Sequence, residues 1–236
     1  MPVDYFLYMG NFGEGNNLII DGLIYDCEIM SYMFKQVLEK IAGEKAPGPS
    51  ATFSLFHILR AMEIMAKQPI GRGMLADTLK VGEGAARTMI NRLQKAGLIA
   101  TSKAGCVLTK KGLSLWKEYT SVFKEKTEID RNELTLAEYN FAILVKNHGH
   151  KVKSGMEQRD AAVMAGAKSA TTLIFREKRL IIPSVSSNVA EDFPKAANQV
   201  FRLLKPDEND VIIIVGASNP EKAWYGALAA AWALLN

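Results

Sequence analysis

Residues 82–97 read GEGAARTMINRLQKAG, and this stretch decides the fold of the region around it. Its apolar residues recur at helical spacing, which predicts a helix over residues 85–96 with one buried face. The opposite face carries guanidinium, amide and ammonium groups, because Arg87, Asn91 and Lys95 follow one another at i, i+4 and i+8. The helix is therefore amphipathic, and its polar face is rich in hydrogen-bond donors.

A β-hairpin is expected directly after this helix. Gly97 predicts a left-handed cap at the helix end. Residues 98–101 and 106–109 then have the composition of two β-strands, and residues 102–105 form the turn between them. A hairpin in this position is typical of the wing of a winged-helix domain.

Shorter helices are expected before this stretch, and another helix after it. Residues 53–67 and 71–79 show helical spacing, and residues 81–84 form a tight turn. A further helix is expected over residues 113–123. The order helix, helix, turn, helix, hairpin and helix within about 75 residues predicts a winged helix-turn-helix domain.

The proline-rich sequence at residues 46–50, APGPS, stops a preceding helix and forms a rigid linker. Apolar residues at helical spacing over 34–41 precede it, so we assign residues 34–123 to the winged-helix domain. We interpret residues 1–33 as an N-terminal extension of low order, or as a segment upstream of the natural start. A short strand pair within 18–25 is the alternative.

The C-terminal part of the chain alternates between strands and helices after a polar connector at residues 124–133. The predicted order β-α-β-β-α-β-α makes residues 134–236 an α/β sandwich domain and gives the whole chain an α+β fold. The expected strands cover residues 139–146, 170–175, 180–185 and 210–215, and the expected helices cover residues 156–167, 193–204 and 220–235.

Composition places the chain among globular proteins, with 48% hydrophobic and 23% charged residues and no apolar run long enough to span a bilayer. Asp4 stands where a signal peptide needs positive charge. The two cysteines, Cys27 and Cys106, have no zinc-site spacing and provide no disulfide framework. We therefore predict a cytoplasmic protein with no membrane partner and no cofactor.

Positive charge is concentrated in the predicted winged-helix region. Residues 48–123 carry 11 Lys/Arg and 4 Asp/Glu, whereas residues 1–47 carry 3 and 7, and residues 124–236 carry 15 and 14. Nucleic-acid binding depends on clustered rather than average charge. The distribution therefore favours DNA as the partner of the middle region.

We predict that the polar face of the 85–96 helix lies in the major groove of double-stranded DNA, which is wide enough for a helix. Lysines before the turn and around the wing are expected to contact phosphates. Arg87 and Arg92 are both expected to face solvent, with Arg87 the better candidate for a base contact. An ordinary solvated helix face is the alternative. The predicted DNA-binding residues are Lys80, Arg87, Thr88, Asn91, Arg92, Lys95, Lys103, Lys110 and Lys111.

Two turns in the C-terminal domain, at residues 153–160 and 215–221, lead through a glycine into polar groups at a helix start. Free N–H groups at such a position attract anions. If strands 139–146 and 210–215 are parallel neighbours, both turns line one pocket for a carboxylate or phosphate. Tight turns and internal pairing of Arg159 are the alternative. The predicted ligand-binding residues are Gly155, Glu157, Gln158, Arg159, Gly216, Ser218 and Asn219.

No catalytic or metal site is predicted from the 3 histidines. His57 fits a packing or surface role in a helix. His148 and His150 have the spacing of a metal pair, but no Cys or clear acidic third ligand stands nearby, so we interpret them as part of a solvated loop. The sequence also contains no recognisable Ser/His/Asp order, carboxylate pair or nucleophile elbow, and we therefore expect no enzyme.

The chain resembles archaeal winged-helix proteins that carry a C-terminal domain of unknown function, DUF4443. The resemblance covers about residues 34–236 and implies a transcriptional regulator, but no ligand, operator or catalytic residue. It rests on the linker at 46–50, on residues 69–72 and 82–88, and on GMEQRDAA at 155–162 with GAKSATTL at 166–173.

These observations together predict a DNA-binding transcriptional regulator that acts as a homodimer. Its C-terminal domain is expected to sense a small anionic effector or to hold the dimer together. The alternative is an enzyme in which the turns at Gly155 and Gly216 bind a phosphorylated or carboxylated small molecule, with the winged helix as a docking module. Salt-dependent binding to duplex DNA distinguishes the two hypotheses.

Overall fold

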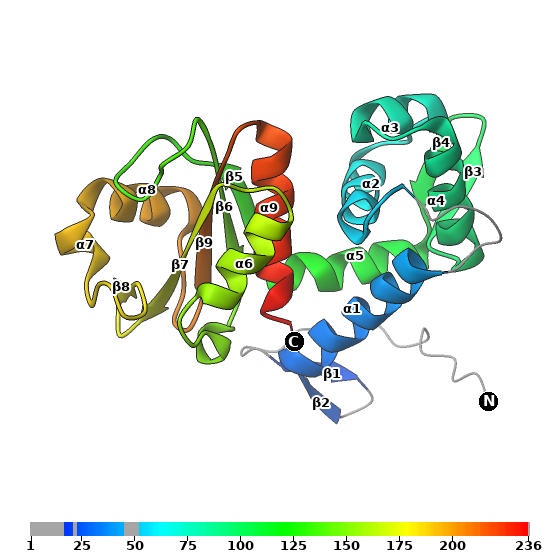
Figure 1. Cartoon of the computed structure of the whole chain (residues 1–236). Coiled ribbons are helices and arrows are strands. Elements are labelled where there is room, and N and C mark those ends of the chain that lie inside the picture. Colours follow the sequence, from blue (N-terminus) through cyan, green and yellow to red (C-terminus); the bar gives the residue numbers. More distant parts are fainter. Residues whose placement is uncertain (1–16, 21–22, 45–51, 236) are drawn as a thin grey trace. The chain divides into compact units, whose positions relative to one another are not determined.

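The structure is a computed structural model that describes residues 17–20, 23–44 and 52–235, with the backbone alone up to residue 32. The chain divides into two units, Met1–Tyr119 and Thr120–Asn236. Figure 1 shows helices gathered around a small hairpin in the first unit, and a larger sheet with helices in the second. The mixture of helical and sheet-containing parts confirms the α+β fold class.

The first unit begins with a short hairpin, β1 (Asn17–Ile20) and β2 (Leu23–Asp26), which pair antiparallel. Helix α1 (Cys27–Gly43) follows at once. An extension of low order reaching to residue 33 is therefore wrong for its last part, because the helix starts at Cys27. Met30 stands at i−4 from Phe34 and carries the helical spacing backwards. The first 16 residues of the predicted extension and the linker predicted at residues 46–50 lie outside the described residues.

Three helices form the centre of the first unit: α2 (Leu55–Lys67), α3 (Arg72–Leu79) and α4 (Glu83–Lys95). Each buries one face, because its apolar residues recur at helical spacing. At the start of α2, the backbone N–H of Ser54 donates to Nδ1 of His57 (3.0 Å), so this histidine caps the helix. The buried core side chains of the three helices include Ile58, Leu59, Met62, Leu75, Leu79, Met89 and Leu93.

The predicted wing is present as an antiparallel hairpin of β3 (Ile99–Ser102) and β4 (Gly105–Leu108). An isolated bridge between Ile70 and Cys106 adds a third segment to it. Gly105 has a φ of 122°, and a Cβ there would lie 2.6 Å from the backbone carbonyl carbon of Ile70. Glycine is therefore required where the hairpin packs against the segment before α3. Helix α5 (Lys110–Val122) follows the wing.

The second unit is built on one sheet with the strand order β5-β6-β9-β7-β8, in which all neighbours run antiparallel. Figure 1 shows α6 and α9 on one face of the sheet and α7 and α8 on the other. The central strand β9 is buried along its whole length, as expected for a strand covered on both faces. The strands are β5 (Phe123–Glu128), β6 (Tyr139–Val145), β7 (Ser169–Arg176), β8 (Arg179–Ile181) and β9 (Val211–Ala217). The helices are a short 3-10 turn at Gly149–Lys151, α6 (Met156–Met164), α7 (Val189–Asp192), α8 (Pro194–Leu204) and α9 (Pro220–Ala233).

Two expectations for the second unit are wrong in detail. The polar segment predicted as a connector at 124–133 contains most of β5, an edge strand. Its charged side chains have the composition of a loop. Such charges suit an edge, because they discourage pairing with another strand. The strand expected over 180–185 ends at Ile181, and Pro183 cannot donate to a sheet ladder.

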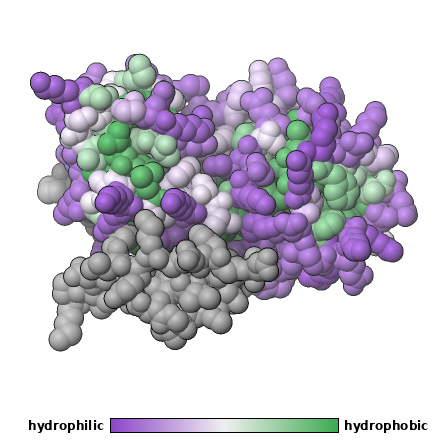
Figure 2. Space-filling model, turned by 180° about the vertical axis from the view of Figure 1, so that it is seen from behind, coloured by the Kyte–Doolittle hydropathy of each residue, from purple (hydrophilic) through white to green (hydrophobic). Residues whose placement is uncertain are grey.

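Large apolar side chains are exposed at separate places in the described part of the chain. Met74, Leu136, Met164 and Val185 lie on different elements or loops, with 65%, 83%, 89% and 70% of their surface exposed. Figure 2 shows hydrophobic residues in limited areas surrounded by hydrophilic ones. Among the described helices, none combines the length and the apolar character that crossing a bilayer requires.

The carboxyl group of Glu118 in α5 is a weaker acid than usual, because burial raises its pKa from 4.5 to about 7. Between these two pH values the folded chain holds a proton that the unfolded chain has lost. The free energy of unfolding therefore falls as the pH rises through this window. We expect Glu118→Gln to raise the free energy of unfolding by about 2–3 kcal/mol near pH ~8 and to leave it almost unchanged near pH ~4.

Urea unfolding of the wild type and the Glu118→Gln variant at both pH values tests this expectation. Equal stabilisation at the two pH values would contradict it, because the glutamine would then act through packing rather than through the lost charge.

Candidate nucleic-acid interface

The exposed side of α4 carries the polar stripe predicted from the sequence. Arg87, Asn91 and Lys95 are all exposed, and they follow one another along one face of the helix. Thr88 lies beside them, but its hydroxyl donates to the carbonyl of Gly84 (2.9 Å). The stripe therefore presents a guanidinium, an amide and an ammonium group, the donors that bind base edges and phosphates.

Gln94 connects α4 to the wing, since its amide donates to the hydroxyl of Thr101 in β3 (3.0 Å). Gln94 is not among the DNA-binding residues predicted from the sequence, although it lies next to Lys95 on the polar side of the predicted helix. The hydrogen bond joins the helix to the hairpin. It therefore helps to hold the two elements that are expected to approach DNA in one arrangement.

Arg92 does not face solvent, and this expectation was wrong. Only 7% of its surface is exposed, and its guanidinium donates to the carbonyl oxygens of Ile41 (3.1 Å) and Ala42 (2.8 Å). The guanidinium also lies 5.2 Å from the ring centroid of Phe53. These carbonyls belong to the last turn of α1, where helix carbonyls lack intrahelical donors. Arg92 thus caps α1 and is unavailable to a DNA groove.

Lys95 is exposed, but it has a carboxylate partner. Its ammonium group lies 2.6 Å from Oε1 of Glu44, just after the end of α1. The hydrogen bond from Lys95 lowers the pKa of Glu44, helped by the nearby charges of Lys95, Arg92 and Lys40. The carboxylate therefore stays ionised at neutral pH and neutralises the last cation of the stripe.

The four lysines expected to contact phosphates surround α4 in the chain. Lys80 ends α3 in a left-handed conformation (φ 53°), and Lys103 stands at the turn of the wing. Lys110 begins α5 and is exposed, whereas Lys111 is half-buried next to Gly97. Arg72, the exposed first residue of α3, is a further cation that sequence analysis missed. Its position at a helix start after Gly71 was the available signal.

The shared ligand pocket predicted in the second unit loses its geometric basis. Strands β6 and β9 are antiparallel neighbours, with Tyr139 opposite Ala217. The carboxyl end of one strand therefore lies beside the amino end of the other. The end of α6, rather than its start, lies near the start of α9: a Cβ at Gly166 would lie 3.5 Å from the side chain of Lys222. The turn at Gly155 therefore lies about 13 Å from the start of α9, a distance equal to one length of α6.

The residues of the first predicted turn have different surroundings. Gln158 is buried (2% exposed), whereas Glu157 and Arg159 are exposed. Glu157 lies 3.8 Å from Lys153, and a guanidinium nitrogen of Arg159 lies 3.9 Å from the sulfur of Met156. These contacts are local to α6. The contact of Arg159 is with a methionine sulfur, whereas the alternative expected a pairing with a neighbouring acid.

The second turn is organised by packing and capping. A Cβ at Gly216 would lie 2.7 Å from the hydroxyl of Ser169 and 2.9 Å from the side chain of Ala137, so only glycine fits. The Asn219 side chain accepts a hydrogen bond from the N–H of Lys222 (2.8 Å) and caps α9. Ser218 is exposed. The glycine and the asparagine thus have structural tasks that do not require a ligand.

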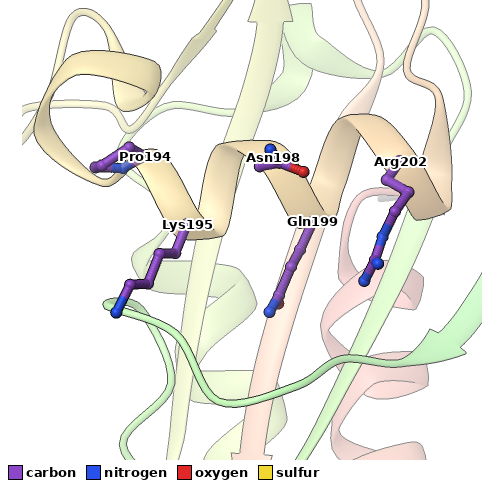
Figure 3. A pocket seen from close by; sticks show the side chains of 5 residues that line it. All are labelled: Pro194, Lys195, Asn198, Gln199 and Arg202. Carbon is purple, nitrogen blue, oxygen red and sulfur yellow. The ribbon is translucent and has the colours of Figure 1, made fainter.

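A shallow groove lies along α8 and was not predicted. It is lined by Pro194, Lys195, Asn198, Gln199 and Arg202. Figure 3 shows Lys195, Gln199 and Arg202 directed to the same side of the helix, toward a neighbouring loop. The spacing of these polar residues on one helix was the signal available in the sequence.

The loop between β5 and β6 holds one side of this groove in place. Asn132 donates its side-chain amide to Gln199 (2.9 Å). The carboxylate of Glu133 accepts the N–H groups of Lys195 (3.1 Å) and Ala196 (2.9 Å) at the start of α8. A carboxylate of the chain itself therefore occupies the anion-binding position at this helix N-terminus.

His148 and His150 lie in a structured turn rather than in a freely solvated loop. His148 is buried, and its Nδ1 lies within hydrogen-bond distance of the carbonyl of Lys146, whereas His150 is exposed and contacts Asn209. Within the residues that the structure describes, no three or more His, Cys, Asp or Glu side chains gather as a metal site would require.

Comparisons with known proteins agree with this architecture. Residues 136–234 match the family described as a domain of unknown function, DUF4443. Earlier in the chain, residues 54–123 match the family described as the CggR N-terminal DNA binding domain. The two matches confirm the resemblance inferred from the sequence, a winged helix followed by DUF4443.

Among solved structures, the hypothetical protein PH0730 from Pyrococcus horikoshii OT3 is similar, with a TM-score of 0.61 and 28% sequence identity. The similarity covers 77% of this chain and 92% of that protein. It therefore extends beyond the residues that match DUF4443. The search of curated proteins finds no match.

Proposed function

We propose that this chain is a DNA-binding transcriptional regulator and that α4 is its recognition helix. The observation that carries the proposal is the exposed stripe of Arg87, Asn91 and Lys95 on the last helix before the wing. The match of residues 54–123 to a family described as DNA-binding supports it independently. The excess of positive charge in residues 48–123, with 11 Lys/Arg and 4 Asp/Glu, supplies the attraction to a polyanion.

In this proposal α4 enters the major groove, where the guanidinium of Arg87 binds a guanine edge and the amide of Asn91 binds an adenine edge. Lys103 on the wing and Lys110 at the start of α5 contact phosphates and set the position of the helix. Arg72 at the start of α3 joins them. Arg92 takes no part in recognition, because it is committed to the end of α1.

We further propose that the DUF4443 domain regulates this binding, either by sensing a small anion or by holding two copies of the chain together. Two copies would place two recognition helices on successive half-sites. The groove on α8 carries Lys195 and Arg202, but the carboxylate of Glu133 holds the start of this helix and Asp130 lies 4.0 Å from Arg202, so the groove does not favour an anion. The turns at Gly155 and Gly216 do not share a crevice, which removes the basis for an enzyme that uses both.

Selection of bound duplexes from a random-sequence pool, followed by anisotropy titrations over a salt series, tests the proposal. We expect one recurring sequence to be enriched, and we expect log affinity to fall linearly with log salt. Lys103→Ala and Lys110→Ala should each weaken binding to all sequences and reduce the salt slope by about 1. Salt-independent or absent DNA binding by the full chain would contradict the proposal.

A further inference from the structure

The end of α1 is fixed against the recognition helix by a buried contact. Arg92 of α4 donates to the carbonyls of Ile41 (3.1 Å) and Ala42 (2.8 Å), and only 7% of its surface is exposed. Glu44 stands two residues beyond the second of these carbonyls. The buried Arg92 contact therefore holds the backbone close to Glu44 in place, and this limits where its carboxylate can lie.

Glu44 places an anion where the exposed stripe of α4 ends. Its Oε1 lies 2.6 Å from the ammonium group of Lys95, and the two side chains are 35% and 77% exposed. Lys40 and Arg92 lie near enough to add to the positive surroundings of this carboxylate. The carboxylate thus occupies the position that a phosphate oxygen would take on Lys95.

We propose that Glu44 is an internal competitor of DNA phosphate for Lys95 and so limits the affinity of the winged helix for DNA of any sequence. This inference rests on the proposed function. Because the pair is exposed, it is weak enough for a phosphate to displace it. Binding must then break the pair between Glu44 and Lys95 before Lys95 can contact a phosphate, which costs free energy. Glu44 therefore lowers the affinity for every duplex by a similar factor, because a phosphate contact is independent of sequence.

Glu44→Gln tests the inference, since it removes the charge and keeps the shape. We expect the variant to bind random-sequence duplex roughly threefold to tenfold more tightly, because a freed cation and one less negative charge then face the phosphates. The slope of log affinity against log salt should become slightly steeper, because rising salt weakens the competing ion pair in the wild type, whereas the variant has no such pair. Circular dichroism and the thermal midpoint should remain those of the wild type.

A double-mutant cycle separates the pair from a general charge effect. In a Lys95→Gln background, Glu44→Gln should change the affinity by less than about twofold, because the cation that it frees is absent. Glu39→Gln is the matched control. It removes another carboxylate of α1, one that lies 3.8 Å from the ammonium group of Lys35. We expect it to leave the salt slope unchanged.

The inference is overturned if Glu44→Gln binds like the wild type with the same salt slope. It is also overturned if the gain persists in the Lys95→Gln background, or if Glu39→Gln produces an equal gain. These outcomes are distinct from a failure of the proposed function, in which the wild-type chain itself shows no salt-dependent binding to duplex DNA.

Discussion

Arg87→Ala is expected to weaken binding to a selected DNA site by about tenfold to a hundredfold. The guanidinium of Arg87 is exposed in the first half of α4, and the structure gives it no structural task comparable to that of Arg92. A bidentate contact to a base edge contributes about 1–3 kcal/mol of discrimination, which sets the size of the loss. The free energy of unfolding should not change, because substitutions of exposed side chains have small effects on stability.

Anisotropy titrations with the selected site and with a scrambled site provide the measurement. We expect Arg87→Ala to reduce the difference between the two affinities, whereas Lys103→Ala lowers both affinities alike. Asn91→Ala should behave like Arg87→Ala at a different base pair. If Arg87→Ala binds both sites as the wild type does while its circular dichroism is native, α4 is not the recognition helix.

Arg92→Ala is expected to act on stability, with a loss of about 2–4 kcal/mol in the free energy of unfolding of the first unit. Two hydrogen bonds from a charged donor to the carbonyls of Ile41 and Ala42 are lost, together with the contact to the ring of Phe53. Arg92→Met retains much of the aliphatic stem and should recover only the packing part of this loss.

Urea unfolding of Arg92→Ala, Arg92→Met and Arg87→Ala makes this comparison within one helix. The two arginines are five residues apart, and the structure assigns one to the protein interior and the other to the surface. Equal stability of the two alanine variants would contradict the capping role of Arg92.

The helices and the wing of the first unit could be predicted because their patterns are local. Helical spacing, the cap at Gly97 (φ 72°) and the turn before Gly105 all depend on residues close together in the chain. The burial of Arg92 could not be predicted in this way. Its position borders the apolar face of α4, and its partners at Ile41 and Ala42 lie about 50 residues earlier, so a tertiary contact decides its role.

The second unit illustrates a different limit. Apolar runs identified its central strands, but a buried run has the same composition in parallel and antiparallel sheets. The shared-pocket hypothesis depended on a parallel arrangement of β6 and β9, which are antiparallel. The edge strand β5 was missed because its solvent-facing charges resemble those of a loop. Strand direction and sheet edges are properties of the whole fold.

The most direct test of α4 as the recognition helix is a DNA titration followed by NMR on the isotope-labelled chain, whose mass is 26.0 kDa. With the selected duplex, we expect the largest chemical-shift changes at Arg87 and Asn91 of α4 and at Lys103 of the wing, and we expect Arg92 to keep the signature of a buried guanidinium. Changes confined to the second unit, with the α4 and wing resonances unmoved at saturating DNA, would contradict the assignment.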